Sequence, residues 1–266
     1  MGTTFYDYND VVDSSNRYQR FWREIQAVTN EEKIQKWKDN AGLIEQSSVL
    51  NNVVVFMFDY SAFEYFYLSE NVKRIVGYTR EEFYKDGVNL SVNLIHPDYM
   101  AARLAMLHFY VKIVEDYPLE KRKDILISTD FLFKNPQEQY MRTVQQTKFL
   151  ELDDKGKPLV SLNYLHSFGS IKKEGSSDLI VKVPDEPALL YHYDFDEKNI
   201  VSAGQLSARE ENILSCLSKG QKTKEIAENL NISPFTVDTH RKNLLLKTHC
   251  KDTSSLVLYA KTTGLM

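Results

Sequence analysis

Hydroxyl and basic side chains recur at helical spacing in the segment 235–247, near the C-terminal end of the chain. At about 100° per residue, Phe235, Thr239 and Lys242 fall on one side of a helix. The other side carries residues suited to packing: Val237, His240, Arg241 and Leu244. Ammonium and hydroxyl groups on a free helix face can donate hydrogen bonds to phosphates and base edges. The pattern therefore indicates binding to nucleic acid.

The flanking sequence predicts the helices that would hold this segment in place. Ser207 and Glu210 have the spacing of a capping box, and Gly220 is suited to end the helix that they begin. We expect Thr223 to cap a second helix, whose apolar side is formed by Ile226, Ala227 and Leu230. Ser233 followed by a proline predicts the start of the third helix, from about Phe235 to Lys247. A fourth helix is expected from Asp252 and Thr253 to Gly264.

The second and third helices are joined only by a short turn at Asn231 and Ile232, which is the form of a helix-turn-helix. A larger set of positions follows one pattern: Leu206, Arg209, Glu210, Ile213, Leu214, Gly220, Lys224, Glu225, Ile226, Ala227, Leu230, Ile232, Ser233, Thr236, Val237, His240, Asn243 and Lys247. This pattern resembles the LuxR/FixJ/NarL-type DNA-binding domain over essentially its whole length.

The resemblance implies a role for particular side chains on double-stranded DNA. Lys224 and Thr236 would contact phosphates, and the positions of Asp238, Thr239 and Lys242 would face bases. The fourth helix would help the domain to dimerise. Asp238 departs from the family, because its surroundings on DNA favour a basic residue, although a carboxylate can accept from a cytosine amino group. Thr248 is a second departure, since the family usually closes the third helix with an apolar residue.

Charge and residue type support DNA contact by this region alone. Residues 206–266 hold nine Lys and Arg against six Asp and Glu, a net charge of +3, whereas the whole chain has a net charge of −4. His240 falls on the packed face and is interpreted as a structural histidine. Cys216 and Cys250, the only cysteines, predict neither a disulfide framework nor a metal cluster, and Cys216 is expected to be buried.

Composition bounds the rest of the chain. A sequence of 266 residues, 42% hydrophobic and 26% charged, can bury a sizeable core and is expected to form two domains with connecting pieces. No segment has the features of a signal peptide or the length of a membrane span. We expect a reduced, cytoplasmic protein that makes no contact with a membrane.

The first segment, residues 1–48, is predicted to be helical. An apolar stripe follows helical spacing at Tyr18, Phe21, Trp22, Ile25 and Val28, and Ile34 with Trp37 continues this character. Such a stripe has to be covered. It packs either on the flank of the following domain or at a subunit interface.

Residues 49–171 predict two strands, three short helical pieces and then three strands. The strands are expected near 53–58, 63–68, 125–133, 140–149 and 159–168. Short motifs accompany this order: Tyr67-Leu68-Ser69-Glu70-Asn71-Val72, Ile75-Val76-Gly77-Tyr78-Thr79, Glu81-Glu82-Phe83, Leu94-Ile95-His96-Pro97-Asp98 and Asp154-Lys155-Gly156-Lys157-Pro158. Together they resemble a PAS sensory domain, which implies an antiparallel five-stranded sheet whose concave face meets the helices over a small cavity.

Strand alternation nominates residues for the wall of that cavity: Phe56, Phe58, Tyr65, Tyr67, Phe131 and Phe133. Simple core is the more usual role for each of these residues, and contact with a ligand is the alternative. We expect no cofactor, because no cysteine suited to flavin photochemistry precedes Cys216. His96 and His108 are weakly placed as haem ligands. The expected occupant is a small apolar molecule, or none.

Residues 172–203 are expected to be a connector and residues 204–266 the DNA-binding domain. The run 172–177 is a polar break, whereas 179–183 and 189–195 look extended, so the connector could be ordered against the sheet. The overall fold class is α+β: N-terminal helices and a PAS-like five-stranded sheet, followed by an all-α, four-helix helix-turn-helix domain.

The predicted function is regulation of transcription by a PAS-like domain that senses a small molecule or a partner and controls the helix-turn-helix. A homodimer on DNA is expected, because one recognition helix covers only a half-site. The candidate dimer surfaces are Leu256, Val257 and Tyr259, and the Tyr18, Phe21 and Trp22 stripe.

Three other functions are alternatives to regulation by a PAS-like domain. A NarL-type response regulator would use Asp59 as its phosphorylated residue, but a second strand follows Asp59 at once. A haem- or flavin-dependent sensor is less favoured. An enzyme would pair His96 with Asp98, but no nucleophile, phosphate loop or metal spacing accompanies them.

Overall fold

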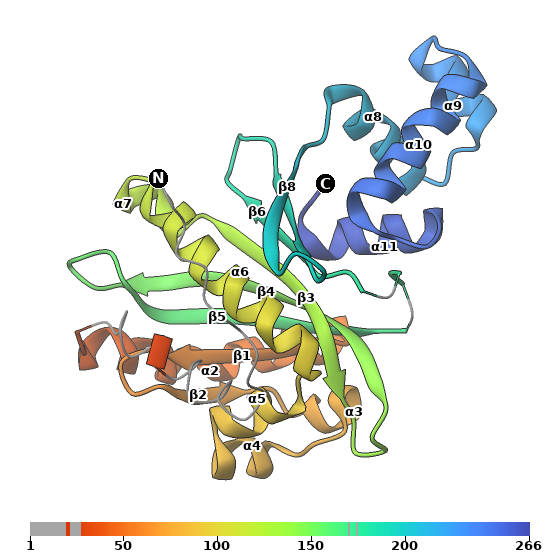
Figure 1. Ribbon diagram of the computed structural model, residues 1–266. Coiled ribbons are helices and arrows are strands. Elements are labelled where there is room, and N and C mark those ends of the chain that lie inside the picture. Colours follow the sequence, from red (N-terminus) through yellow and green to blue (C-terminus); the bar gives the residue numbers. More distant parts are fainter. Residues whose placement is uncertain (1–19, 22–27, 170, 174) are drawn as a thin grey trace.

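The computed structural model describes residues 20–21, 28–169, 171–173 and 175–266. In this part of the chain, one antiparallel sheet carries helices on both faces, and a compact helical domain follows it at the C-terminal end (Figure 1). The fold class is α+β, as predicted. Of the predicted apolar stripe, Tyr18, Trp22 and Ile25 lie outside the described residues, whereas Phe21 is buried in the main core.

The first five strands form the sheet that the sequence predicts, in the order β2-β1-β5-β4-β3. Their bounds are β1 Val54–Asp59, β2 Glu64–Leu68, β3 Leu126–Lys134, β4 Tyr140–Leu152 and β5 Pro158–Phe168. Neighbouring strands in this sheet are antiparallel. An alternating parallel β/α arrangement is what a receiver domain needs, so this fold excludes the response-regulator alternative. Asp59 accepts hydrogen bonds from the backbone of Ser61 and Ala62 and so closes a turn.

The predicted number of five strands is wrong, because the connector adds three more to the same sheet. These are β6 Asp178–Lys182, β7 Leu189–Asp194 and β8 Asn199–Gln205, and the full order is β2-β1-β5-β4-β3-β6-β7-β8. Residues 126–129 of β3 pair with residues 179–182 of β6. The physical reason is that β3 would otherwise be an edge strand with unpaired backbone groups.

Five helices lie between β2 and β3 in the chain and cover the concave face of the sheet. They are α3 Val72–Val76, α4 Arg80–Asp86, α5 Val88–Leu94, α6 Pro97–Glu115 and α7 Leu119–Arg122. Thr79 and Glu82 form a capping box at the start of α4. His96 accepts a hydrogen bond from the Asp98 amide and caps α6, with Pro97 at the first helical position. His96 and Asp98 thus meet at the start of a helix, where the ring acts as a cap; the enzyme alternative would have used them as an acid–base pair.

Helix α2, Glu31–Asn51, packs on the opposite face, over β1 and β2. Its buried side chains include Ile34 and Ala41, and the indole of Trp37 donates a hydrogen bond to Glu151. The N-terminal helical region therefore covers the flank of the following domain. The helix continues to Asn51, beyond the predicted boundary at residue 48.

The C-terminal domain consists of the four predicted helices: α8 Ala208–Ser218, α9 Thr223–Leu230, α10 Pro234–Thr248 and α11 Thr253–Thr263. The Ser207 and Glu210 capping box and the Ser233 cap form as predicted. The predicted Thr223 cap is wrong, because Thr223 is the first helical residue of α9. Lys222 holds the cap position instead, and its amide donates to the Glu225 carboxylate.

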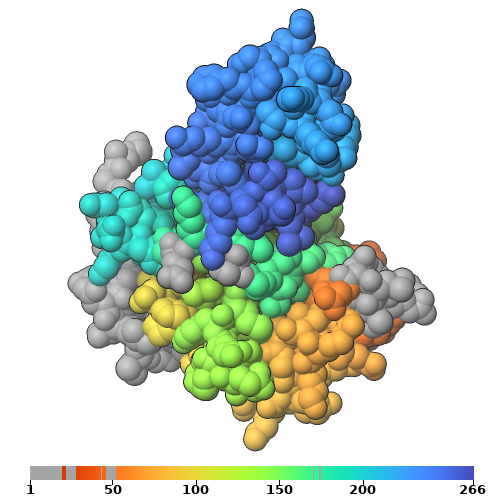
Figure 2. Space-filling view, turned by 90° about the vertical axis from the view of Figure 1, so that its right-hand side faces the viewer, coloured from red at the N-terminus to blue at the C-terminus, as the bar shows by residue number. Residues whose placement is uncertain are grey.

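The core of this domain continues into the outer face of the sheet. Ile213, Leu244 and Leu256 of the domain share one cluster of buried residues with Val144 of β4 and Ile180 of β6. In Figure 2, the end of the chain (dark blue) forms the base of the domain beside the strands, whereas α9 and α10 extend away from them. The domain is thus docked on the sheet through α11.

Candidate DNA interface, ligand cavity and domain junction

Helix α10 presents the predicted face to solvent. Phe235, Thr239 and Lys242 are exposed, whereas Val237 and Leu244, on the opposite side, are completely buried. His240 is half-buried. The helix therefore has one packed side and one free side, as the helical period predicts. An α-helix with a free side fits a major groove.

The acidic residue on this helix is engaged within the protein. The Asp238 carboxylate lies 2.9 Å from the Arg241 guanidinium and accepts a hydrogen bond from the Thr223 hydroxyl at 3.3 Å. Arg241 also donates to the Thr223 hydroxyl. These contacts connect the N-terminal end of α9 to α10, and the Arg241 charge compensates the carboxylate. Asp238 can therefore lie near phosphates with less repulsion than a free carboxylate.

The predicted phosphate contacts lie at the N-terminal ends of two helices. Lys224 is exposed in the first turn of α9. The Thr236 hydroxyl is in the first turn of α10, 2.8 Å from the Ser233 hydroxyl that caps the helix. Thr239 donates its own hydroxyl to the Phe235 carbonyl and keeps its acceptor sites open. Free amides at a helix N-terminus suit a phosphate group.

Phe235 is an exposed residue on the free side of α10 that is absent from the predicted DNA contacts. Its side chain is 80% exposed beside Thr239, which is unusual for a phenylalanine in a small domain. An aromatic side chain at this place can contact the methyl group of thymine. The available signal was its position on the same helical side as Thr239 and Lys242.

A second candidate site is an interior cavity of about 90 Å³ between the concave face of the sheet and helices α3 to α6. Phe56, Phe58, Tyr65, Phe131 and Phe133 line it, so five of the six nominated residues are on its wall. Other apolar lining residues come from the helices: Val72, Phe83, Val88, Val92, Leu107 and Tyr110. Neither His96 nor His108 is among the lining residues, and His108 contacts the Leu104 carbonyl through its ring nitrogen.

Tyr67 is the exception, and its nomination is wrong. A β-bulge shifts the register: Met57 pairs with Tyr67, but Phe58 pairs with Tyr65, so Phe66 is the extra residue on β2. A bulge turns the side chains that follow it to the other face. The Tyr67 ring therefore packs beside Met57 on the outer face, and its hydroxyl donates to Glu45 of α2.

The floor of the cavity carries a polar chain that its mainly apolar wall does not suggest. The Arg103 guanidinium donates to Gln145 at 2.6 Å and to Thr129 at 3.5 Å, and lies over the Phe131 ring, 4.5 Å from its centroid. Gln145 in turn donates to Asn163. Within the described residues, no carboxylate pairs with Arg103. Its charge is held by neutral groups beside the cavity.

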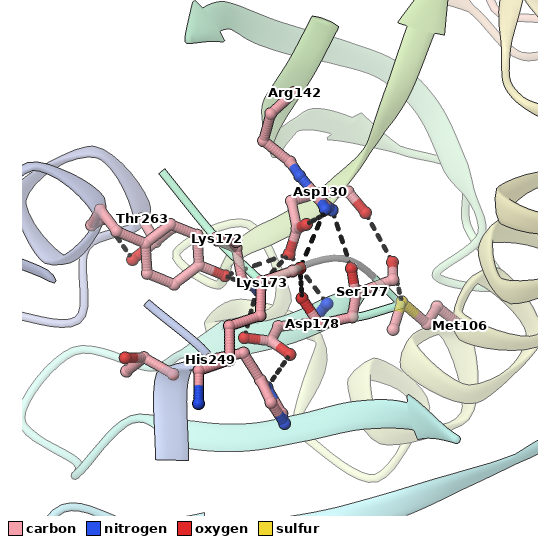
Figure 3. Close-up of polar contacts among 12 residues, drawn as sticks. Met106, Asp130, Arg142, Lys172, Lys173, Ser177, Asp178, His249 and Thr263 are labelled. Carbon is pink, nitrogen blue, oxygen red and sulfur yellow. Dashed lines mark hydrogen bonds and ion pairs between the residues drawn. The ribbon is translucent and has the colours of Figure 1, made fainter. Parts of the chain in front are cut away.

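The third feature is a cluster of buried charges where the helical domain meets the sheet, hereafter the Lys172 cluster: Asp130, Arg142, Lys172, Asp178, His249 and Tyr259 (Figure 3). The Lys172 ammonium is fully buried and contacts both Asp130 and Asp178. Arg142 contacts the second oxygen of Asp130 at 2.6 Å.

The C-terminal domain supplies two members of this cluster. The Tyr259 hydroxyl of α11 donates to Asp130 at 3.3 Å, and His249, which ends α10, lies 3.1 Å from Asp178. Burial alone would raise the pKa of the Asp178 carboxyl, but the Lys172 charge and the His249 contact lower it below its usual value. The cluster is therefore a charged network, in which the Lys172 cation and the His249 contact favour the ionised form of the Asp178 carboxyl.

Sequence reasoning missed this cluster. The run 172–177 reads as a polar linker, yet Lys172, Ser176 and Ser177 are all buried. Leu256 and Tyr259, nominated for a dimer surface, are also buried, because α11 packs on the sheet. That nomination is wrong for these two residues. In α11, Leu258 is exposed and Val257 is half-buried.

Comparison with known proteins identifies the C-terminal region. Residues 204–260 match the family described as bacterial regulatory proteins, luxR family. The C-terminal region of the chain therefore carries a LuxR-type helix-turn-helix domain, of a family of bacterial regulatory proteins. Within the described residues, no helix combines the length and apolar character needed to cross a bilayer.

Two curated relatives align with this region. The transcriptional regulatory protein MctR of Rhizobium johnstonii is 43% identical over 61 residues, which are 23% of this chain and 28% of MctR. The transcriptional regulatory protein FixJ of Rhizobium meliloti is 40% identical over 73 residues, 27% of this chain and 36% of FixJ. The chain thus spans about a third of the length of these relatives.

Solved structures of VqmA are similar over more of the chain. The VqmA–ligand–DNA complex from Vibrio cholerae is 16% identical, with a TM-score of 0.29, and the match covers 84% of this chain and 88% of that one. The phage VqmA–DPO complex is 14% identical, with a TM-score of 0.30, and the match covers 86% and 91%.

Proposed function

We propose that this protein regulates transcription by inserting α10 into the major groove of double-stranded DNA. The observation that carries the proposal is the free face of α10 in a LuxR-type domain: Thr239 and Lys242 are exposed above a buried Val237 and Leu244. Thr239, Lys242 and the position of Asp238 face bases, and Lys224 with Thr236 holds the phosphate backbone. A regulator of this kind acts on the chromosome, which places it in the cytoplasm.

The DNA-bound form is proposed to be a homodimer. A single recognition helix covers one half-site, and two linked half-sites supply the affinity that a regulator needs. In α11, Val257 and Leu258 are the apolar side chains that remain accessible for such a contact. Sedimentation of the full chain with its operator is expected to show two chains per site, and one chain per site at saturation would exclude the dimer.

The experiment that tests the main proposal is recovery of bound DNA. The full chain is incubated with fragmented genomic DNA of its host, and the retained fragments are sequenced and compared with those retained by a Lys242→Ala variant. A shared, inverted-repeat motif upstream of genes, enriched by the parent chain and relaxed at one position of each half-site in the variant, supports regulation at specific sites. Fragments without any shared motif would contradict it.

The cavity is proposed to bind a small molecule that controls this activity. A dry cavity of about 150 Å³ accepts benzene, so a cavity of about 90 Å³ fits a molecule of at most about six heavy atoms. Among the described residues, Arg103 has no carboxylate partner, and it lies beside this space, so the occupant is expected to carry a carboxylate or a similar acceptor at one end. The aromatic wall suits an apolar remainder.

Short-chain carboxylates are the probes for this second proposal. Butyrate is expected to raise the melting temperature of the full chain, whereas its uncharged analogue butyramide is not, and Arg103→Met should abolish the effect. Lys112→Met, on the exposed side of the same helix, is the matched control. An equal response to butyrate and butyramide would show that Arg103 does not select an anionic group.

A further inference from the structure

Strand β3 connects the cavity to the C-terminal domain, because its alternate side chains point to opposite faces of the sheet. Thr129 and Phe131 line the cavity. Their neighbours Ser128 and Asp130 face the C-terminal domain instead: the Ser128 hydroxyl donates to the Thr263 carbonyl at 2.9 Å, and Asp130 accepts from Tyr259. A displacement of β3 on the cavity side therefore moves groups that hold α11.

Strand β4 repeats this arrangement. Gln145 faces the cavity, where it binds Arg103, and Val144 packs in the cluster shared with the C-terminal domain. Arg142, two residues further along that second face, reaches Asp130. Both strands below the cavity thus contribute to the same junction on their other side.

The junction also positions the end of the recognition helix. His249 ends α10 in a left-handed conformation, with a φ of 53°, and its ring contacts Asp178. The Lys173 amide donates to the His249 carbonyl, and the Lys251 amide donates to the Ile171 carbonyl. The turn between α10 and α11 is therefore tied to the segment that carries Lys172.

A network of this kind is sensitive to small displacements. Each charge is removed from water, so the attraction repays the lost hydration only while the geometry holds, and removal of one partner leaves another charge buried alone. Apolar packing tolerates a shift of a fraction of an ångström much better. The Lys172 cluster is thus the part of the junction that depends most on the position of β3.

We propose that the Lys172 cluster is a latch that holds the DNA-binding domain on the sensor sheet, and that β3 and β4 make the latch responsive to the cavity. The reading of the cavity as a sensor site rests on the proposed function. The latch itself does not. It is tested on the full chain with neither DNA nor ligand present, so failure of the latch and failure of the proposed function give different results.

The first test opens the latch. In Lys172→Met, hydrogen exchange of the amides of α11 is expected to accelerate at least about tenfold, and the radius of gyration in solution should rise. Exchange in α9 and in β1 should stay at the wild-type rate, because the domains themselves remain folded. Lys134→Met, which removes a half-buried lysine at the far end of β3, is the matched control and should leave α11 unchanged.

A second variant covers the case in which Lys172→Met fails to fold. Tyr259→Phe keeps the ring in its packed place and removes only the hydroxyl that reaches Asp130. Exchange in α11 should then accelerate about three- to tenfold. Wild-type exchange in Tyr259→Phe would overturn the latch. So would loss of protection in β3 and β1 together with α11 in either variant, because the cluster would then belong to the global fold.

The last test addresses the connection to the cavity. Arg103→Met alters the cavity face of β3 and β4 without touching the junction, and it should change α11 exchange by about threefold or more. Lys112→Met on the same helix should not. An unchanged α11 in Arg103→Met would overturn the coupling through the sheet.

Discussion

Two sides of the C-terminal domain, the free side of α10 and the side under α11, depend on different kinds of contact. The free side of α10 is set by the helical period, and its contacts join residues of the helix-turn-helix itself: Asp238 with Arg241, Thr236 with Ser233, and Asp238 with Thr223, 15 positions away. The side under α11 is set by partners far along the chain, since Tyr259 reaches Asp130 across 129 positions. The free side of α10 therefore depends on the helix-turn-helix alone, whereas the junction depends on the assembled sheet.

The two sides also differ in the surroundings of their lysine side chains. Lys242 and Lys224 are exposed to solvent, where an anion such as a phosphate can reach them. Lys172 is completely buried and already compensated by two carboxylates. The first kind of lysine contributes to binding and little to stability, whereas the second is part of the architecture. Substitutions on each side of the domain, and one on the sheet, test this difference.

The largest effect is expected for Asp130→Ala. It leaves Lys172 and Arg142 buried with one carboxylate fewer, and should lower the free energy of unfolding by about 3–5 kcal/mol. Denaturation by urea measures it. The matched control is Asp124→Ala, whose carboxylate forms an exposed ion pair with Lys148 and should matter by less than about 1 kcal/mol. Similar losses in the two variants would mean that the buried cluster has no special role.

The packed side of α10 comes next. Leu244→Ala removes a completely buried side chain and should destabilise the domain by about 2–5 kcal/mol. Leu246→Ala, two residues further along, removes a side chain that is 55% exposed, and its effect should lie within about 0.5 kcal/mol. Thermal unfolding followed by circular dichroism compares them. If Leu246 mattered as much as Leu244, the assignment of the two sides would be wrong.

Acid should weaken the outer sheet face through His166. Burial lowers the pKa of this histidine from 6.5 to about 4, so between these two values the unfolded chain binds a proton that the folded chain does not. Stability is therefore full above pH 6.5 and falls as the pH drops toward 4, by at most about 3 kcal/mol. Subtracting the pH profile of His166→Gln from that of the parent isolates this contribution, and identical slopes in the two profiles would exclude it.

The smallest effects belong to the free side. Lys242→Ala should cost about 1–3 kcal/mol at the operator and relax specificity at one base pair, with unfolding unchanged. Lys224→Ala should weaken all sequences alike and reduce the salt slope of binding by about 1. Lys85→Ala, on an exposed helix of the sensor domain, is the control for total charge. Fluorescence anisotropy at several salt concentrations measures all three, and wild-type specificity in Lys242→Ala would remove it from the base-reading set.

Much of this molecule follows from local chemistry. The capping box of Ser207 and Glu210 sets the start of α8, the Ser233 cap with Pro234 sets the start of α10, and alternating aromatic residues place Phe58 and Phe131 on one face of their strands. Such features depend on neighbours within a few residues. The helix-turn-helix and the five strands of the sensor sheet could be predicted for that reason.

The remaining features depend on contacts that no short pattern encodes. One extra residue at Phe66 turns Tyr67 away from the cavity, and a bulge of this kind is decided by pairing with β1. The connector pairs with the free edge of β3 and adds three further strands to the sheet. Lys172 reads as a solvated linker residue, yet it is buried, because Asp130 and Asp178 meet it only once the sheet has formed. Periodicity predicts which side of its own helix or strand a residue occupies, whereas only the assembled sheet determines what covers that side.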